Sequence, residues 1–227
     1  MSPAGSADGP LRLQYSGELE QLSLQTEMMG VLVDESLERM REVLRTGDLA
    51  VAAATVADDD RIDATNVSLT ERCYELLRRE APVAADLRLI VSVLRLTAEL
   101  ERIGDLALRV VKLAPEHALL ERVPTAFDIL LTMADDGIER FRDALRAWSS
   151  LDLDLAVVVA TAPRSTYATE HLIQVLHSYD GPEAVPVAIR TMVAGQALDR
   201  IADHASILGA RVRYLITGDP AHLAAEV

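Results

Sequence analysis

Apolar residues recur every three or four positions along most of this chain, the spacing that places them on one face of an α-helix. The pattern is clear in residues 11–45, where Leu22, Met29 and Met40 share a face. Five further stretches show the same spacing, and Gly, Pro or polar residues separate them. The sequence therefore predicts an all-α protein with six long helices, at residues 11–45, 49–79, 83–113, 125–148, 153–178 and 182–216.

The connections between these stretches contain residues suited to turns. Gly47 can adopt the left-handed conformation that follows many helices, and Asp48 can cap the N-terminus of the next one. Pro82 lies between the second and third stretches, and Pro115 follows the third. Short connections of this kind imply that consecutive helices are antiparallel neighbours.

The helix pattern repeats within the chain. Residues 34–42 match residues 135–143, and Glu-Arg-Ile-Gly-Asp at 101–105 is answered by Asp-Arg-Ile-Ala-Asp at 199–203, at offsets of 101 and 98. This similarity indicates a duplicated three-helix unit. We expect two repeated antiparallel three-helix bundles, set end to end or side by side. The expected bounds are a flexible tail at 1–10, a first repeat at 11–114, a linker at 115–124, a second repeat at 125–217 and a C-terminal tail at 218–227.

Charge and composition then exclude several classes of protein. A net charge of −14 disfavours direct binding to DNA, RNA or an anionic lipid surface. The single cysteine, Cys73, allows no internal disulfide and fits a reducing compartment, where we expect it as a small buried residue. Residues 1–10 lack the pattern of a signal peptide, and no apolar run approaches the ~18 residues of a membrane span. The sequence predicts a cytoplasmic protein that reaches a membrane only through protein partners.

Two pairs of carboxylates in the first half have metal-ligand chemistry. Glu101 and Asp105 stand four residues apart, on one face of a helix, and Asp59 and Asp63 repeat this spacing in the helix before. If these helices are antiparallel neighbours, four carboxylates can converge into an oxygen-rich site suited to Mg, Ca, Mn or Fe ions. The alternative is that these acids are solvated surface residues.

The second half keeps only part of this pattern. Asp199 and Asp203 match the first motif, but the preceding predicted helix has no carboxylate between Asp154 and Glu170. Pro163 is expected to kink that helix. A second metal site would therefore be incomplete. His204 could add a nitrogen ligand, although a histidine beside an acid is more often a hydrogen-bonded structural group.

Two runs of sequence resemble the PhoU family of phosphate-transport accessory proteins. They are Ala-Pro-Val-Ala-Ala-Asp-Leu-Arg-Leu-Ile at 81–90 and Glu-Arg-Ile-Gly-Asp-Leu-Ala at 101–107. The acids at 59–63 and the run Asp-Arg-Ile-Ala-Asp-His-Ala at 199–205 extend the resemblance over nearly the whole chain.

The resemblance implies a six-helix fold of two three-helix bundles and a regulator that represses the phosphate-starvation response. It also implies communication between a phosphate ABC transporter and a sensor histidine kinase, without catalysis. Family members can bind multinuclear metal clusters, which carries over to Asp59, Asp63, Glu101 and Asp105, and only in part to Asp199 and Asp203.

Other functions remain open from the sequence. One alternative is a metalloenzyme that activates water or oxygen on the first carboxylate cluster. Another is a plain helical oligomerisation module, and a homodimer is expected for an elongated bundle.

Overall fold

The computed structural model describes residues 8–79, 82, 84–163 and 166–222. Within these ranges the chain is helical and contains no strand, which confirms the predicted all-α class. The elements in chain order are α1 (Asp8–Thr46), α2 (Leu49–Asp58), α3 (Asp60–Arg79), α4 (Ala85–Val111), the 3-10 turn η1 (Ala114–Glu116), α5 (His117–Leu120), α6 (Pro124–Ser150), α7 (Leu153–Ala160), α8 (Thr166–His177) and α9 (Ala184–Thr217).

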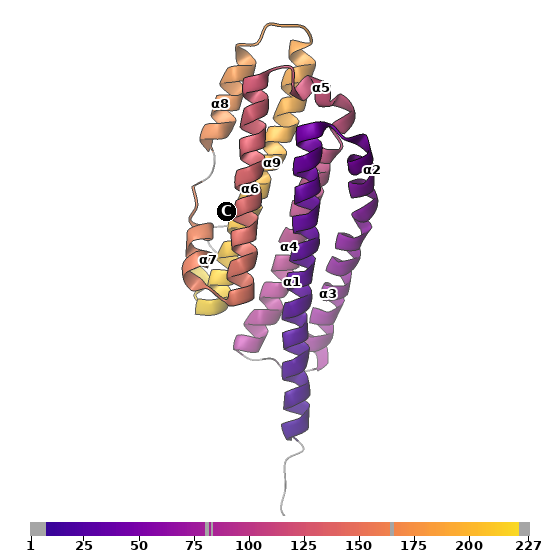
Figure 1. Ribbon diagram of the computed structural model, residues 1–227. Helices are drawn as coiled ribbons and strands as arrows, with labels where there is room; N and C mark the ends of the chain where they lie inside the picture. The colour runs from indigo at the N-terminus through magenta and orange to yellow at the C-terminus, as the bar shows by residue number, and fades with distance from the viewer. Residues whose placement is uncertain (1–7, 80–81, 83, 164–165, 223–227) are drawn as a thin grey trace, which may run out of the picture.

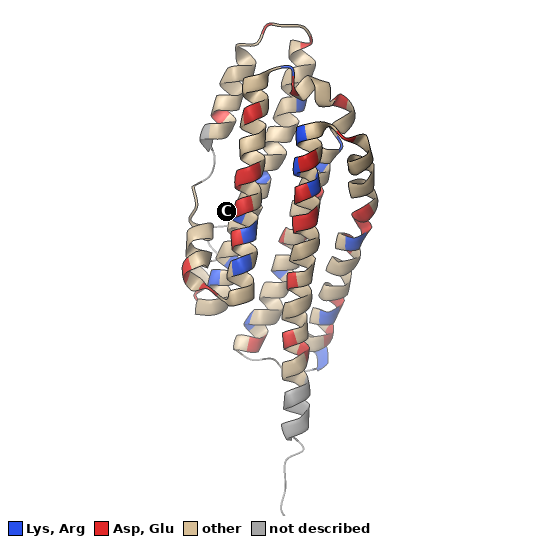
Figure 2. Cartoon of the chain, viewed as in Figure 1, with Lys and Arg blue, Asp and Glu red and all other residues tan. Residues whose placement is uncertain are grey.

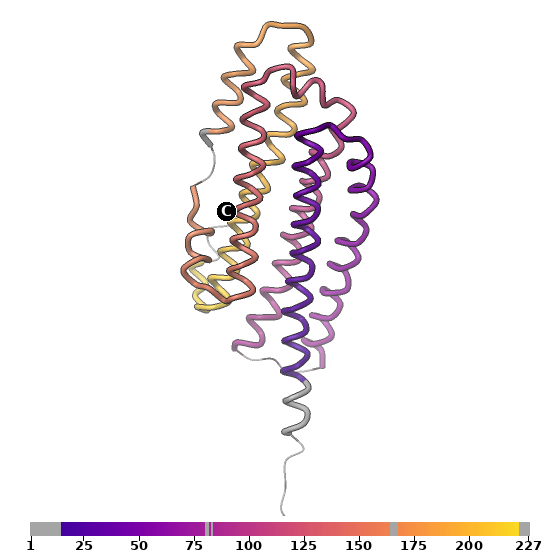
Figure 3. Tube along the Cα trace, in the orientation of Figure 1, coloured from indigo at the N-terminus to yellow at the C-terminus, as the bar shows by residue number. Residues whose placement is uncertain are grey.

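The two halves of the chain lie side by side (Figure 1). Helices α1 and α4 of the first half pack against α6 and α9 of the second, so these four long helices form the centre of the molecule. The α2–α3 pair covers the outer side of the first half, and the α7–α8 pair covers the outer side of the second. Figure 3 shows the chain path through both halves, which repeats the order of long helix, divided helix, long helix.

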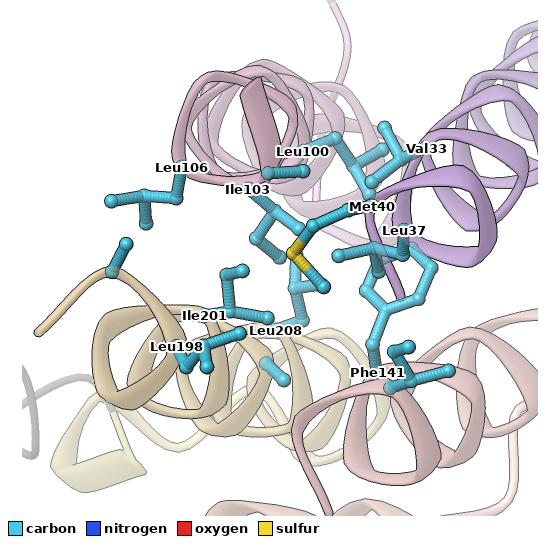
Figure 4. Close-up of a cluster of buried hydrophobic side chains, with 14 of the residues drawn as sticks. Val33, Leu37, Met40, Leu100, Ile103, Leu106, Phe141, Leu198, Ile201 and Leu208 are labelled. Carbon is cyan, nitrogen blue, oxygen red and sulfur yellow. The ribbon is translucent and has the colours of Figure 1, made fainter. Parts of the chain in front are cut away.

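A single apolar core runs through the four central helices. Met40 from α1, Ile103 from α4 and Phe141 from α6 are completely buried, and Ile201 from α9 is 1% exposed. Figure 4 shows side chains of this cluster meeting from helices of both halves. The hydrophobic stripes predicted on the separate helices therefore bury one another across the halves, which fixes the side-by-side arrangement.

Most residues of the predicted stripes are buried, and the turn at residues 46–48 has the expected form. Gly47 has a φ of +67°, and the Asp48 carboxylate accepts hydrogen bonds from the backbone N–H groups of Ala50 and Val51. Cys73 is fully buried, and burial raises the pKa of its thiol to about 12. Leu87 has the apolar spacing of the stretch predicted at 83–113, but its side chain is 41% exposed in the first turn of α4.

Two of the six predicted helices are divided. The second becomes α2 and α3, which meet at Asp59, where the N–H of Ile62 donates to the Asp59 carbonyl only three residues back, at 2.9 Å. The fifth becomes α7 and α8, so the chain around Pro163 leaves the helix where only a kink was expected. Proline has no N–H to continue the helical ladder, which accounts for the stronger break.

The same arginine of each repeat lies at these divisions. Arg39 on α1 forms an ion pair with Asp58, the last residue of α2. Arg140, its counterpart at an offset of 101, donates to the carbonyl of Pro163 at 3.2 Å, beyond the end of α7. Each half thus uses an arginine of its first helix to hold the chain where its second helix is divided.

The predicted linker and tails are partly ordered into helices. Within 115–124 the chain forms α5, and the Nε2 atom of His117 lies 2.9 Å from the carbonyl oxygen of Leu44 near the end of α1. Residues 8–10 of the predicted N-terminal tail begin α1, and residues 220–222 form a 3-10 turn. Residues 1–7 and 223–227 lie outside the described residues.

Ion pairs between α1 and α6 follow the internal repeat. The Arg142 guanidinium on α6 donates through Nε and Nη2 to the Asp34 carboxylate on α1, at 2.7 and 3.1 Å. Arg41 on α1 lies 3.3 Å from Asp135 on α6. In the internal repeat, at an offset of 101, Asp135 is the counterpart of Asp34 and Arg142 is the counterpart of Arg41. The two ion pairs therefore join the same two repeat positions in opposite directions. Figure 2 shows the charged residues along these two helices. The reciprocal pairing relates α1 and α6 by a local pseudo-two-fold axis.

None of the described helices combines the length and the apolar character that a membrane span requires.

Candidate metal centre

Packing of α3 against α4 brings the first-half carboxylates into one region. Asp59 lies at the junction of α2 and α3, and Asp63 lies in the first turn of α3. Glu101 and Asp105 stand on α4, on either side of the buried Gly104. A Cβ atom placed on Gly104 would lie 3.2 Å from Cδ1 of Ile62 on α3, so the two helices approach closely between the acid pairs.

The four carboxylates influence one another electrostatically. Burial raises the pKa of Asp59, and the negative charges of Asp63 and Asp105 raise it further. Burial also raises the pKa of Glu101, with added contributions from Asp105, Asp63 and Asp59. Burial and like charge both disfavour an ionised carboxylate. The raised pKa values therefore indicate that neighbouring groups do not fully balance the negative charge of this region.

Two nearby cations offset this charge only in part. Lys112, just after α4, lowers the pKa of Asp59, and Arg102 lowers that of Glu101. The pKa of each carboxyl nevertheless remains raised. A further cation at this position would relieve the remaining repulsion.

The four carboxylate side chains do not converge on a common point. Asp63 and Asp105 are exposed, whereas Asp59 and Glu101 are half-buried. Among the described residues, no three His, Cys, Asp or Glu side chains are arranged as they would be around a metal ion. Coordination by three or more of these carboxylates would require their side chains to change rotamer.

The second-half motif has an acidic neighbour on α6 and none on the helix before it in the repeat. Asp199 on α9 lines a cavity of about 230 Å³ together with Asp136 and Arg140 of α6 and with Pro163. No acid comes from α7 into this cavity, and neither Asp199 nor Asp203 is without a partner.

Asp136 was not predicted as a neighbour of Asp199, because it lies on α6 and not on the helix that precedes α9 in the repeat. The internal repeat contained the signal, since the offset of 101 aligns Asp136 with Glu35. Glu35 lines a small pocket that also includes Asp59, at the division between α2 and α3. Each half therefore has an acid of its first helix beside a pocket at the divided second helix.

His204 is held as a structural histidine. Its Nδ1 atom lies 2.6 Å from a carboxylate oxygen of Glu99 on α4, and both side chains are largely buried. This contact links the central helices of the two halves and engages the Nδ1 atom of the ring.

The fold and the site define a class of protein: an all-helical bundle of two duplicated three-helix halves, with a carboxylate cluster on the first. The PhoU domain family matches residues 26–114, which lie within the first half. The phosphate-specific transport system accessory protein PhoU homolog 2 of Mycobacterium tuberculosis is 30% identical over 92% of this chain and 99% of its own length. The PhoU homolog of Pseudomonas putida is 29% identical, over 90% of this chain and 81% of that protein.

The architecture is also that of a solved structure. The crystal structure of PhoU from Pseudomonas aeruginosa superimposes with a TM-score of 0.85 at 28% identity, covering 90% of this chain and all of that one. Sequence and structure thus agree over nearly the whole chain, and the chain belongs to the PhoU family.

Proposed function

We propose that this protein regulates phosphate uptake and represses the phosphate-starvation response when phosphate is plentiful. The observation that carries the proposal is the similarity over almost the full length of both chains to a protein named as an accessory of a phosphate-specific transport system. The relatives from Pseudomonas putida and Escherichia coli have names of the same kind.

The proposed mechanism is adaptor binding without catalysis. In the cytoplasm, as a homodimer, the helical surface docks on a phosphate ABC transporter and on a sensor histidine kinase. By binding one conformation of each partner more tightly than another, it shifts their signalling equilibrium. The protein reaches the membrane only through these partners.

We further propose that the first-half carboxylates bind metal. Asp59, Asp63, Glu101 and Asp105 would hold a divalent cation or iron, because they supply hard oxygen donors in a region of excess negative charge. Asp199 and Asp203 would contribute less, since both already have partners in the chain. When bound, the metal would supply charge neutralisation that lets the acid pairs remain ionised.

Metal analysis of the purified protein tests this second proposal. We expect bound metal in the wild-type protein and a loss of it in Asp105→Ala, whose side chain is exposed and whose removal leaves the core intact. The matched control is Asp128→Ala, which removes an exposed acid of α6 that lines neither carboxylate region and should leave the metal content unchanged. Equal metal content in all three proteins, or none in any, would contradict the proposal.

A deletion strain tests the regulatory function. We expect the strain to express its phosphate-starvation genes in high phosphate, and the wild-type gene to restore repression. Normal repression of these genes in the deletion strain would contradict the proposed function.

A further inference from the structure

The first half has an apolar groove between α1 and α3 that the carboxylate site does not use. The groove has a volume of about 510 Å³, and Met28 and Val31 line it from α1. These two residues are 59% and 48% exposed, and Leu24, one turn earlier, is 57% exposed. Spacings of four and three residues place the three side chains along one face of the helix. We call this surface, from Leu24 to Val31 and across to α3, the α1–α3 groove.

The groove is open because α3 presents small side chains to it. Ala64, Thr65 and Ser68 line the wall opposite Met28 and Val31, and the buried Leu69 contributes to the same pocket. Small residues leave the larger apolar side chains of α1 without contact on this side.

The exposed stripe is not a general requirement of the repeated fold. At an offset of 101, the positions of Leu24 and Val31 are taken by Thr125 and Thr132 on α6, whereas Ile129 stands at the position of Met28. Both threonines are exposed, so the fold of the second half tolerates a polar residue at these two positions. The repeated fold therefore does not require large apolar residues at the positions of Leu24 and Val31, and together with Met28 they form an exposed apolar surface of the kind that marks interaction sites.

Exposed acids mark both ends of the α1–α3 groove. Helices α1 and α3 run antiparallel, because Arg72 donates to Gln21 at 2.7 Å and Arg79, further along α3, lies 3.6 Å from Glu18, earlier on α1. Glu20 and Glu71 accordingly lie at one end and Glu35 and Asp60 at the other, each about one turn beyond the apolar residues. None of these four acids forms an ion pair with another described residue. The cation Arg61 also lines the groove, and its charge acts on Asp58.

We propose that the α1–α3 groove docks an amphipathic helix of a partner protein. The docked helix has apolar side chains at positions i, i+4 and i+7, which fill the space beside Met28 and Val31. It has Lys or Arg residues at both ends, which pair with the acids there. The inference rests on the proposed adaptor function, because an adaptor needs a protein-docking surface.

The charges argue against two other occupants. If a second copy packed its α1 antiparallel on this face, Glu20 of one copy would oppose Glu35 of the other at both ends, and like charges would repel. An anionic lipid surface would be repelled by the same acids. A helix with basic ends satisfies both the apolar centre and the acidic ends.

Photo-crosslinking in cells tests which occupant binds. A photoreactive amino acid replaces Met28 in the full chain, and the matched control replaces Ile189, which is 52% exposed on α9. We expect the Met28 position to crosslink to an amphipathic helical segment with basic residues at both ends, and the Ile189 position not to crosslink to it. A product between two copies of this chain, a segment without basic ends, or no product beyond the control would each overturn the inference.

A synthetic peptide of the crosslinked segment then measures the contribution of the groove. We expect Met28→Lys and Glu20→Lys each to raise the Kd of the peptide about tenfold, and Ile189→Lys to leave it unchanged. Circular dichroism shows whether each variant keeps its helices and thermal transition. A folded Met28→Lys protein that binds the peptide like wild type would contradict the inference.

The outcome is separable from that of the proposed function. If the deletion strain loses repression but Met28→Lys binds the peptide normally, the groove inference fails and the function stands. If the deletion strain keeps repression, the proposed function fails whatever the peptide binding shows.

Discussion

At the scale of single residues, the first-half carboxylates hold more negative charge than their neighbours balance. Burial and like charge raise the pKa values of Asp59 and Glu101, and Lys112 and Arg102 offset these effects only in part. A carboxyl group whose pKa is raised by folding binds its proton more tightly in the folded state than in the unfolded state. Ionisation of these groups therefore lowers the stability of the folded protein as the pH rises.

Neutralising Glu101 should consequently stabilise the protein. In the metal-free protein, prepared with a chelator, we expect Glu101→Gln to raise the free energy of unfolding at pH 7 by about 0.5 kcal/mol, the scale of a like-charge pair four residues apart on a helix. The gain should shrink towards about pH 4, because there the wild-type carboxyl is itself largely protonated. Urea unfolding of both proteins at the two pH values measures the difference.

The control for this prediction is Glu75→Gln on α3, which removes an exposed acid outside the carboxylate region. It should change the free energy of unfolding little at either pH. A stabilisation by Glu101→Gln that is the same at both pH values would show that charge is not its cause.

At the scale of helices, a glycine on α9 allows α7 to pack close to the α9 backbone. A Cβ atom placed on Gly209 would lie 2.9 Å from the backbone nitrogen of Ala160 and 2.8 Å from Cγ1 of Val159. Helix α7 thus packs directly against the backbone of α9 at this point. Since α7 precedes the break at Pro163, this contact anchors the end of the divided helix.

Gly209→Ala should destabilise the protein although alanine favours a helix. The added methyl group must displace the backbone of α7, and we expect a loss of about 1–3 kcal/mol in the free energy of unfolding. Chemical denaturation measures it. Gly17→Ala on α1 is the matched control, because its Cβ atom would meet nothing within 4 Å and should stabilise the protein by up to about 1 kcal/mol. Equal effects of the two substitutions would contradict the close approach.

At the scale of the whole molecule, the duplicated halves are joined by a shared core and by reciprocal ion pairs. The hydrophobic cluster includes Met40 and Ile103 of the first half with Phe141 and Ile201 of the second. The Asp34–Arg142 pair and its counterpart, Arg41–Asp135, lie over this core between α1 and α6. The halves are therefore held by burial, and the ion pairs favour one register of α1 on α6.

A double-mutant cycle measures the contribution of these pairs. We expect Asp34→Ala and Arg142→Ala to be coupled by about 0.5–1 kcal/mol, because the pair is bidentate and partly buried. The counterpart cycle on Arg41 and Asp135 should give a smaller coupling, since that contact is longer and the Asp135 side chain is 61% exposed. Unfolding in urea at low and high salt measures both cycles, and both couplings should weaken in high salt. Zero coupling between Asp34 and Arg142 at low salt would show that the pair does not hold the halves.

The amino-acid sequence by itself determined what depends on short-range spacing. The helical stretches and their order follow from apolar residues every three or four positions, although two of the six predicted helices are divided. The internal repeat follows from matched motifs, and the Asp48 cap from hydrogen bonds to residues just after it. The sequence also showed which acids form pairs, because two residues four positions apart lie on the same face of a helix. The full burial of Cys73 likewise agreed with its chemistry.

Only the tertiary structure decided what depends on residues that lie far apart in the chain. The side-by-side packing, the contact of His204 with Glu99 and the position of Asp136 beside Asp199 all join helices from different places in the chain. The hydrophobic pattern of one helix shows which face is buried but not which partner buries it. For that reason the α1–α3 groove, which arises where small residues of one helix face large ones of another, appears only in the packed molecule.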